Sequence, residues 1–238
     1  MTFRGLVLAT ALAACLLSAP TPAVADPATD PATETGTETG TETGTETGTE
    51  TGSLDKLDSL PVKGRAPKTG YDRDLFGQNW TDDVTVDYGR NGCDTRNDML
   101  RRDLVDVVIR PGTNGCTVLS GVLDDPYTGT VVTFRRGPQT SAEVQIDHVV
   151  ALSDAWQKGA QQLDDTARQD FANDPANLQA TLGWVNQQKG AGDAATWLPP
   201  NKSYRCTYVS RIVDVKAAYG LWVTAAERDA IARVLADC

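Results

Sequence analysis

The chain has 238 residues but only one histidine, and it contains no Cys-x-x-Cys pair. These two shortages exclude a zinc centre with the usual cysteine and histidine spacing. Basic residues are also in the minority, since 22 lysines and arginines stand against 32 aspartates and glutamates. A protein that wraps a nucleic acid in a broadly basic surface is therefore excluded, and any phosphate contact must depend on local charge.

Long apolar runs are absent as well, and the run at residues 6–17 is too short for a stable membrane span. It follows a basic residue and precedes an A-x-A pattern at residues 23–25, so residues 1–25 are predicted to be a secretory signal peptide. The alternative is a lipoprotein signal, LAAC, in which Cys15 would carry a lipid anchor. Under either interpretation the protein is expected to be secreted or otherwise extracytoplasmic.

The segment that follows is short of apolar side chains. Residues 33–52 are five copies of Thr-Glu-Thr-Gly, which cannot offset the entropy of ordering by burial. We therefore predict a disordered acidic linker that continues into an irregular arm over residues 26–70, either as a spacer or as a repeat without a role. Removing Arg4 and the seven acids of residues 1–52 from the totals leaves a net charge of −4 over the other 186 residues.

Four cysteines remain after the signal, namely Cys93, Cys116, Cys206 and Cys238. An even number in an exported protein predicts disulfides. Three pairings are open, and we favour Cys93–Cys116 with Cys206–Cys238 because each closes a local unit.

Residues 71–238 are predicted to form a single α+β domain. Two β-rich runs at residues 116–123 and 130–135 flank a turn cluster and predict a hairpin. Further strands are expected at residues 143–149 and 177–181. Helices are expected at residues 97–106, 164–171 and 183–190, followed by two C-terminal helices, the last opened by a capping box at residues 224–227.

Candidate chemistry gathers around the single histidine. The imidazole of His148 can accept a proton near neutral pH, and the adjacent carboxylate of Asp147 suits a hard cation such as Mg²⁺. Asn186 offers a neutral oxygen ligand, and Lys189 lies on the same helix face, where it could meet phosphate charge. On a regular strand Asp147 and His148 would point to opposite faces, so we expect the strand to end or bend there.

These residues, with Asn177, have the order and spacing D-H, N-L and N-x-x-K. The pattern resembles the HNH, or ββα-metal, endonucleases in their H-N-N variant. It is similar in particular to exported bacterial proteins related to the C-terminal domain of the GmrSD type IV restriction enzymes. The resemblance covers roughly residues 71–238 and includes the segments FG at 76–77, NGCDTRND at 91–98, FANDP at 171–175 and WLPP at 197–200.

The resemblance implies an embedded ββα-metal motif and an endonuclease that hydrolyses phosphodiester bonds with little sequence specificity. His148 would be the general base, while Asp147 and Asn186 would hold one divalent ion, Mg²⁺ or alternatively Mn²⁺. Asn177 would brace the loop that shapes the site, and Lys189 would stabilise transition-state charge.

Two further interpretations remain open from the sequence. Arg135 and Arg136 could contact the backbone of a nucleic-acid substrate, for which DNA is favoured. The family segment also contains Arg96 and Asp98, for which the sequence indicates no role. The alternative to a nuclease is a non-catalytic envelope or nucleic-acid-binding protein that retains the fold.

Overall fold

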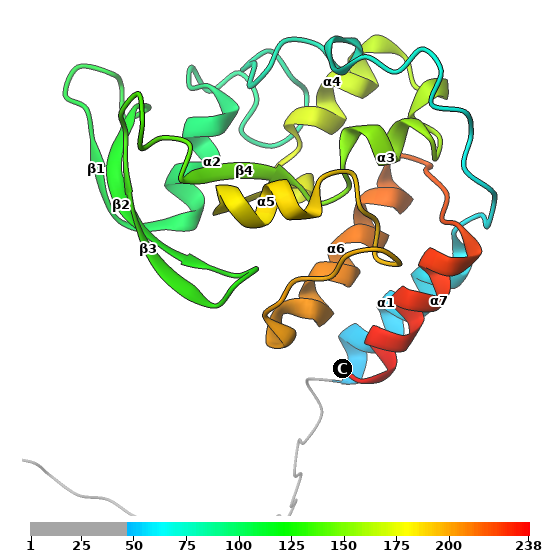
Figure 1. Ribbon diagram of the computed structural model, residues 1–238. Helices are drawn as coiled ribbons and strands as arrows, with labels where there is room; N and C mark the ends of the chain where they lie inside the picture. Colours follow the sequence, from blue (N-terminus) through cyan, green and yellow to red (C-terminus); the bar gives the residue numbers. More distant parts are fainter. Residues whose placement is uncertain (1–46) are drawn as a thin grey trace, which may run out of the picture. The chain divides into compact units, whose positions relative to one another are not determined.

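The computed structural model describes residues 47–238, with side chains from Gly52 onward. The predicted signal peptide, Cys15 and the repeats up to residue 46 lie outside the described residues. The fold is α+β, as predicted, with small antiparallel sheets and two disulfides (Figure 1). In chain order its elements are α1 (Thr47–Ser59), η1 (Arg73–Phe76), α2 (Thr95–Asp103), β1 (Leu104–Ile109), β2 (Val118–Asp125), β3 (Thr130–Arg135), β4 (Val144–His148), α3 (Leu152–Trp156), η2 (Ala160–Gln162), α4 (Asp165–Asn173), η3 (Pro175–Asn177), β5 (Leu178–Leu182), α5 (Gly183–Lys189), η4 (Lys202–Tyr204), α6 (Arg205–Ala218) and α7 (Ala225–Ala236).

Helix α1 corrects the expectation of a linker and irregular arm through residue 70. Leu54, Leu57 and Leu60 recur every three residues, and this spacing gives the helix one apolar side. Leu57 is fully buried and Leu60 nearly so, and both belong to the main hydrophobic core. Figure 1 shows α1 lying beside α7. The acidic repeat composition hid this short apolar stripe at its end.

Strands β1, β2 and β3 form an antiparallel sheet in that order, and β2 and β3 are the predicted hairpin. The helix expected at residues 97–106 is shorter than predicted, because α2 ends at Asp103. Leu104 already has an extended backbone, with φ −98° and ψ 147°, and begins β1. The β-branched run after it gains ladder hydrogen bonds and packing from β2, and these override its helical spacing.

Strands β4 and β5 form a second antiparallel pair, and β5 runs directly into α5. This is the predicted strand, strand and helix order. Figure 1 shows α5 lying beside β4. His148 stands opposite Leu178 in the register, so the end of β4 lies beside the start of β5. Gly183 lets α5 begin close to the loop before β4, since a Cβ there would lie 2.4 Å from the carbonyl oxygen of Ala142.

Two hydrophobic clusters hold these elements together. The larger one gathers α1, α3, α4, α6 and α7 around residues such as Phe171 and Ile212, and the smaller one lies between α2 and the two sheets around Leu100 and Phe134. No helix within residues 47–238 combines the length and apolar character that a bilayer-spanning segment needs.

Both predicted disulfides are confirmed. Cys93 is bonded to Cys116, which ties the start of α2 to the start of β2. Cys206 is bonded to Cys238, which ties α6 to the residues after α7.

Candidate functional site

The candidate site lies at the C-terminal end of β4, which ends at His148. The backbone N–H of Val149 donates to the carbonyl of Asn177 at 2.7 Å, and the N–H of Val150 donates to the side-chain oxygen Oδ1 of Asn177 at 2.8 Å. The side-chain nitrogen of Asn177 donates to the carbonyls of Val150 and Phe171, each at 3.3 Å. Asn177 is fully buried, so its contacts go to the protein interior. These bonds hold the backbone in a bend immediately after His148.

Asp147 and His148 leave the strand in different directions and still border one cleft. Asp147 meets Lys189 and Tyr127, whereas His148 meets the carbonyl of Ala172. The cleft has a volume of about 490 Å³, and its lining includes both residues. The two side chains therefore keep the opposite directions of a strand. Because β4 ends at His148, both residues can border the same cleft.

Asp147 is a buried carboxylate with two strong partners. The ammonium of Lys189 lies 3.0 Å away and also donates to the carbonyl of His148 at 2.6 Å, while the hydroxyl of Tyr127 donates to Oδ2 at 2.8 Å. Burial raises the pKa of Asp147 above its ordinary value, although the charge of Lys189 and these hydrogen bonds act in the opposite direction. Lys189, which the sequence analysis directed at a phosphate, is itself buried and contacts Asp147.

His148 is held in one tautomer. Its Nε2 lies 2.9 Å from the carbonyl oxygen of Ala172, and because a carbonyl can only accept, Nε2 must carry the hydrogen. The other nitrogen, Nδ1, is then the basic one. Burial and, to a lesser extent, the positive charges of Arg73 and Lys189 lower the pKa of His148 to about 3, although the hydrogen bond to Ala172 acts in the opposite direction. The imidazole is therefore neutral at physiological pH.

The cleft carries basic and polar groups from elements distant in the sequence. Arg73 comes from η1 and Arg96 from α2, while Asn186 on α5 donates through Nδ2 to Oε1 of Gln145 on β4 at 2.9 Å. This contact makes Oδ1 of Asn186 the atom that can bind a cation. Burial lowers the pKa of Arg96, and the nearby charge of Arg136 adds to this effect.

The possible metal ligands of the cleft are oxygen atoms. Within residues 52–238 no group of three or more His, Cys, Asp or Glu side chains is placed to hold an ion. The carboxylate of Asp147 and the amide oxygen of Asn186 instead offer two oxygen ligands beside an open cleft. Mg²⁺ is commonly held in this way, by one or two protein oxygens with water and substrate phosphate completing the shell. By residue type these oxygens suit such an ion and not a closed zinc site. Both oxygens of Asp147 already accept hydrogen bonds, from Lys189 and Tyr127, so an ion there would share the carboxylate with them.

Arg135 and Arg136 lie elsewhere. They border a separate hollow on the β1–β3 sheet, and neither is in the lining of the cleft beside His148. Arg136 is occupied by Val118 and Asn97, to whose oxygens it donates at 2.5 Å each. Arg135 is exposed on β3.

Sequence reasoning missed three residues that contact or border the site. Tyr127 sits in the turn between β2 and β3 yet is fully buried, and a single aromatic among Asp, Pro and Gly was the available signal. Arg73 and Trp80 belong to the segment between α1 and α2, here called the arm (residues 61–93), which has almost no regular structure. The sequence around Arg73 and Trp80 has no periodic pattern that could have predicted their place beside the cleft.

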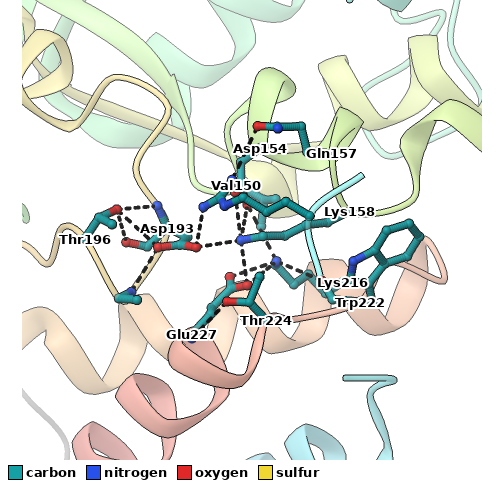
Figure 2. A network of polar contacts seen from close by, with 12 residues as sticks. Val150, Asp154, Gln157, Lys158, Asp193, Thr196, Lys216, Trp222, Thr224 and Glu227 are labelled. Carbon is teal, nitrogen blue, oxygen red and sulfur yellow. Dashed lines mark hydrogen bonds and ion pairs between the residues drawn. The ribbon is translucent and has the colours of Figure 1, made fainter. Parts of the chain in front are cut away.

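A second polar assembly lies behind the cleft. Lys158, just after α3, is fully buried, and its ammonium lies 2.7 Å from carboxylate oxygens of Asp154, Asp193 and Glu227 (Figure 2). Burial alone would lower the pKa of Lys158, but the attraction of the carboxylates is larger and the net direction is upward. The lysine therefore remains charged inside the protein.

Two further cations complete this assembly. Lys216 on α6 lies 2.8 Å from Glu227 and also donates to the carbonyl of Trp222 at 3.1 Å, while Arg65 on the arm reaches Asp154 at 2.8 Å and Asp193 at 2.6 Å. Three cations thus face three carboxylates. We call this set the buried charge cluster; its members are Arg65, Asp154, Lys158, Asp193, Lys216 and Glu227.

The capping box predicted at the last helix forms only in part, because the side chain of Glu227 belongs to the buried charge cluster. Thr224 does cap α7 by accepting the N–H of Glu227 at 3.2 Å. The side chain of Glu227 turns inward to the two lysines instead of returning to Thr224. An ion pair with buried lysines is stronger than a reciprocal cap in water.

The chain is similar to known proteins. The model of the family described as GmrSD restriction endonucleases, C-terminal domain, matches residues 94–234, which include His148, Asn177, Asn186 and Lys189. A protein of Arthroderma benhamiae described as an uncharacterized secreted protein is 39% identical over 184 residues, covering 76% of this chain and 82% of that protein. No solved structure matches. Since the family model spans more than half of the chain, the protein belongs to the family of the GmrSD restriction endonuclease C-terminal domain.

Proposed function

We propose that the protein is an exported, metal-dependent endonuclease of the HNH type that hydrolyses phosphodiester bonds. The observation that carries this proposal is the neutral imidazole of His148 beside the carboxylate of Asp147, with Asn186 across the same cleft. Family membership supports a nuclease-related function, and nucleic acid, with DNA favoured, is the substrate class that follows.

His148 has the geometry of a general base. Its Nε2–H is fixed on Ala172, so Nδ1 can accept the proton of an attacking water. A pKa of about 3 makes the isolated site a weak base, but it also ensures that the ring carries no proton beforehand. A phosphodiester anion in the cleft would favour the imidazolium and raise the pKa toward the working range.

Asp147 and Asn186 would hold the divalent ion. Bound there, the ion supplies Lewis-acid stabilisation of the phosphate charge and of the leaving oxygen. Lys189 and Tyr127 keep the carboxylate of Asp147 in a fixed orientation. In this arrangement Lys189 acts by placing and partly neutralising Asp147.

Export is consistent with the two disulfides, which persist in oxidising compartments, and with the secreted relative. The second candidate function is a non-catalytic binding protein of the cell envelope. The buried, ion-paired position of Asp147 is the observation in its favour, because Lys189 already satisfies part of the carboxylate's charge.

The test is cleavage by purified, disulfide-intact protein. Supercoiled plasmid and single-stranded circular DNA are incubated with Mg²⁺ or Mn²⁺, and matched samples contain EDTA. We expect nicked and linear products that appear only with the divalent ion. Intact DNA in every metal sample, from protein whose circular dichroism shows a folded chain, would establish the non-catalytic alternative.

A further inference from the structure

The arm covers the single histidine in an unusual way. The indole of Trp80 is nearly parallel to the imidazole of His148, with 12° between the planes and 5.9 Å between the ring centroids. Trp80 has φ +58°, in the left-handed region that a bulky residue occupies only at a cost. Its carbonyl accepts the N–H of Thr95 at 3.2 Å, which ties the arm to the start of α2. A strained aromatic against the proposed base indicates a role beyond packing.

Two arginines converge on the same cleft from separate elements. Arg73 on η1 is exposed, and Arg96 on α2 is half-buried. Arg96 uses its Nη2 to donate to the carbonyls of Ser141 and Val144, at 3.0 and 2.9 Å, so the rest of its guanidinium fork can serve an anion. Arginine is the side chain best suited to phosphate oxygens.

The number of cations favours one form of nucleic acid over the other. Arg73 and Arg96 are the arginines or lysines in the cleft lining, and two phosphate contacts supply much less affinity than the roughly six to ten of a strongly salt-dependent duplex binder. With a net acidic composition, two arginines would hold a duplex weakly at physiological salt. Affinity must therefore come from another source.

The indole of Trp80 can add affinity by stacking with a base, but only where the faces of the bases are accessible. In a duplex each base is paired and stacked, and exposing one costs a few kcal/mol, roughly. An unpaired strand offers both a flexible backbone and accessible base faces, and stacking on an aromatic side chain is worth about 1–3 kcal/mol per base. The lining of the cleft combines an indole with two guanidinium groups, which are the components of a single-strand site.

We propose that the cleft beside His148 binds an unpaired nucleic-acid strand in preference to a duplex. Arg73 and Arg96 contact its phosphates, and Trp80 stacks with a base next to the scissile bond. The proposal rests on the proposed function, because it names the substrate class of that same site. It moves the phosphate contacts from Arg135 and Arg136 to residues of the arm and α2.

The experiment measures binding without cleavage. Fluorescence anisotropy in EDTA compares a short oligothymidylate with a hairpin duplex that carries the same label. We expect the unpaired strand to bind at least about tenfold more tightly, given one stacked base. Equal or tighter binding of the duplex would overturn the proposal.

Variants locate the contacts. Arg73→Gln and Arg96→Gln should each reduce the slope of log affinity against log salt by about 0.7, the value for one single-strand phosphate contact. Arg135→Gln is the matched control, because it removes an exposed arginine outside the cleft, and its slope should equal that of the wild type. An unchanged slope in Arg73→Gln, or a changed slope in Arg135→Gln, contradicts the placement.

The aromatic contact is tested in the same assay. Trp80→Leu should weaken binding of the unpaired strand by about tenfold, while Trp80→Phe should retain most of it. If Arg96→Gln does not fold, Arg96→Lys keeps the charge and should retain the wild-type slope. Equal affinities of Trp80→Leu and wild type for the unpaired strand would refute the stacking role.

The two proposals can fail separately. Metal-dependent cleavage of plasmid with no preference for unpaired strands would leave the nuclease and remove the strand preference. Preferential binding that depends on Arg73 and Trp80, without cleavage in any metal, would support the strand site and remove the nuclease.

Discussion

Two buried lysines meet carboxylates in this protein, and their surroundings differ. Lys158 faces three carboxylates within the buried charge cluster, and no member of that cluster is in the lining of the cleft. Lys189 faces one carboxylate, Asp147, and one backbone carbonyl, and Asp147 does border the cleft. Lys158 and its three carboxylates are buried and lie outside the lining of the cleft, whereas the second arrangement leaves its carboxylate beside open volume.

Both lysines are buried, so burial does not distinguish their roles. The position of their carboxylate partners, inside or outside the cleft lining, does distinguish them. In the cluster three cationic side chains face three carboxylates, so its charges are satisfied within the protein, although burial lowers the pKa of Lys216. The cluster also links two segments that border the cleft, because Asp154 follows the lining residue Ser153 and Asp193 lies two residues after Ala191. We therefore assign the cluster a structural role, and the pair of Asp147 and Lys189 a functional one, because Asp147 borders the cleft that a ligand can enter.

The largest effect on activity is expected at the open site. His148→Ala should lower the cleavage rate by about 10²- to 10⁴-fold, the range for loss of a general base. Plasmid nicking under single-turnover conditions measures this loss. Circular dichroism and urea unfolding at pH 7 are the controls, and a folded variant with the wild-type rate would show that His148 is not the base.

The largest effect on stability is expected in the closed cluster. Lys158→Met should lower the free energy of unfolding by about 3–5 kcal/mol, because three buried carboxylates lose their central partner. Urea denaturation measures this change. Lys202→Met, which removes an exposed lysine on η4, is the matched control and should change stability by less than about 0.5 kcal/mol. A loss below about 1 kcal/mol for Lys158→Met would mean that the cluster is neutral to stability.

Metal dependence should separate the roles of Asp147 and His148 within the open site. Asp147→Asn keeps the shape and a partner for Tyr127 but removes the ligand charge, so we expect activity to fall by at least about tenfold at low Mg²⁺. Extra Mg²⁺ or Mn²⁺ should recover part of this loss, and it should recover none of the loss in His148→Ala. A metal titration of the cleavage rate measures both, and identical metal curves for wild type and Asp147→Asn would remove Asp147 from the ligand set.

The elements that could be predicted from the sequence are those with a local cause. The β2–β3 hairpin follows from two β-branched runs around a turn, and the helix expected at residues 164–171 is α4, which Asp164 caps by accepting the N–H of Ala167. The disulfide pairing follows from local closure. His148, Asn177 and Asn186 could be selected because their spacing is that of a known family.

The rest depends on contacts between distant residues. Nothing near Lys189 in the sequence shows that it would contact Asp147, which is 42 residues away. The buried charge cluster draws on the arm, α3, the chain after α5, α6 and α7, and each member alone looks like an exposed surface charge. Helix α1 was missed because its apolar stripe needs α6 and α7 for burial.

The two regions should also respond to pH in different ranges. The folded-state pKa of His148 is lowered to about 3, below its unfolded value near 6.5, so only the unfolded chain takes up a proton between these values. Stability is therefore complete above pH 6.5 and falls as pH decreases, by up to about 1.4 kcal/mol per pH unit. Urea unfolding in EDTA at pH 7.5, 6.5 and 5.5, roughly the plateau and the upper end of that range, measures the onset of the slope.

His148→Ala should lack this part of the slope, which makes it the control. Asp193 in the cluster behaves differently: burial raises its pKa, but Lys158 and Arg65 outweigh this and the net shift is downward. Its contribution is present above the ordinary carboxyl pKa and is lost only as pH falls through the lowered value. Identical slopes for wild type and His148→Ala down to pH 5.5 would contradict a buried, neutral histidine.

The smallest effect is expected at the outer edge of the cluster. Arg65 contacts Asp154 and Asp193, the same carboxylates as Lys158, but its side chain is 36% exposed. Water screens its charge and can replace it, so Arg65→Gln should cost at most about 1 kcal/mol of unfolding free energy. A double-mutant cycle with Lys158→Met measures the coupling, which should be larger than the single effect of Arg65→Gln, because Arg65 becomes the nearest remaining cation for both aspartates. A cost for Arg65→Gln equal to that of Lys158→Met would show that the arm holds the cluster together as firmly as its buried lysine does.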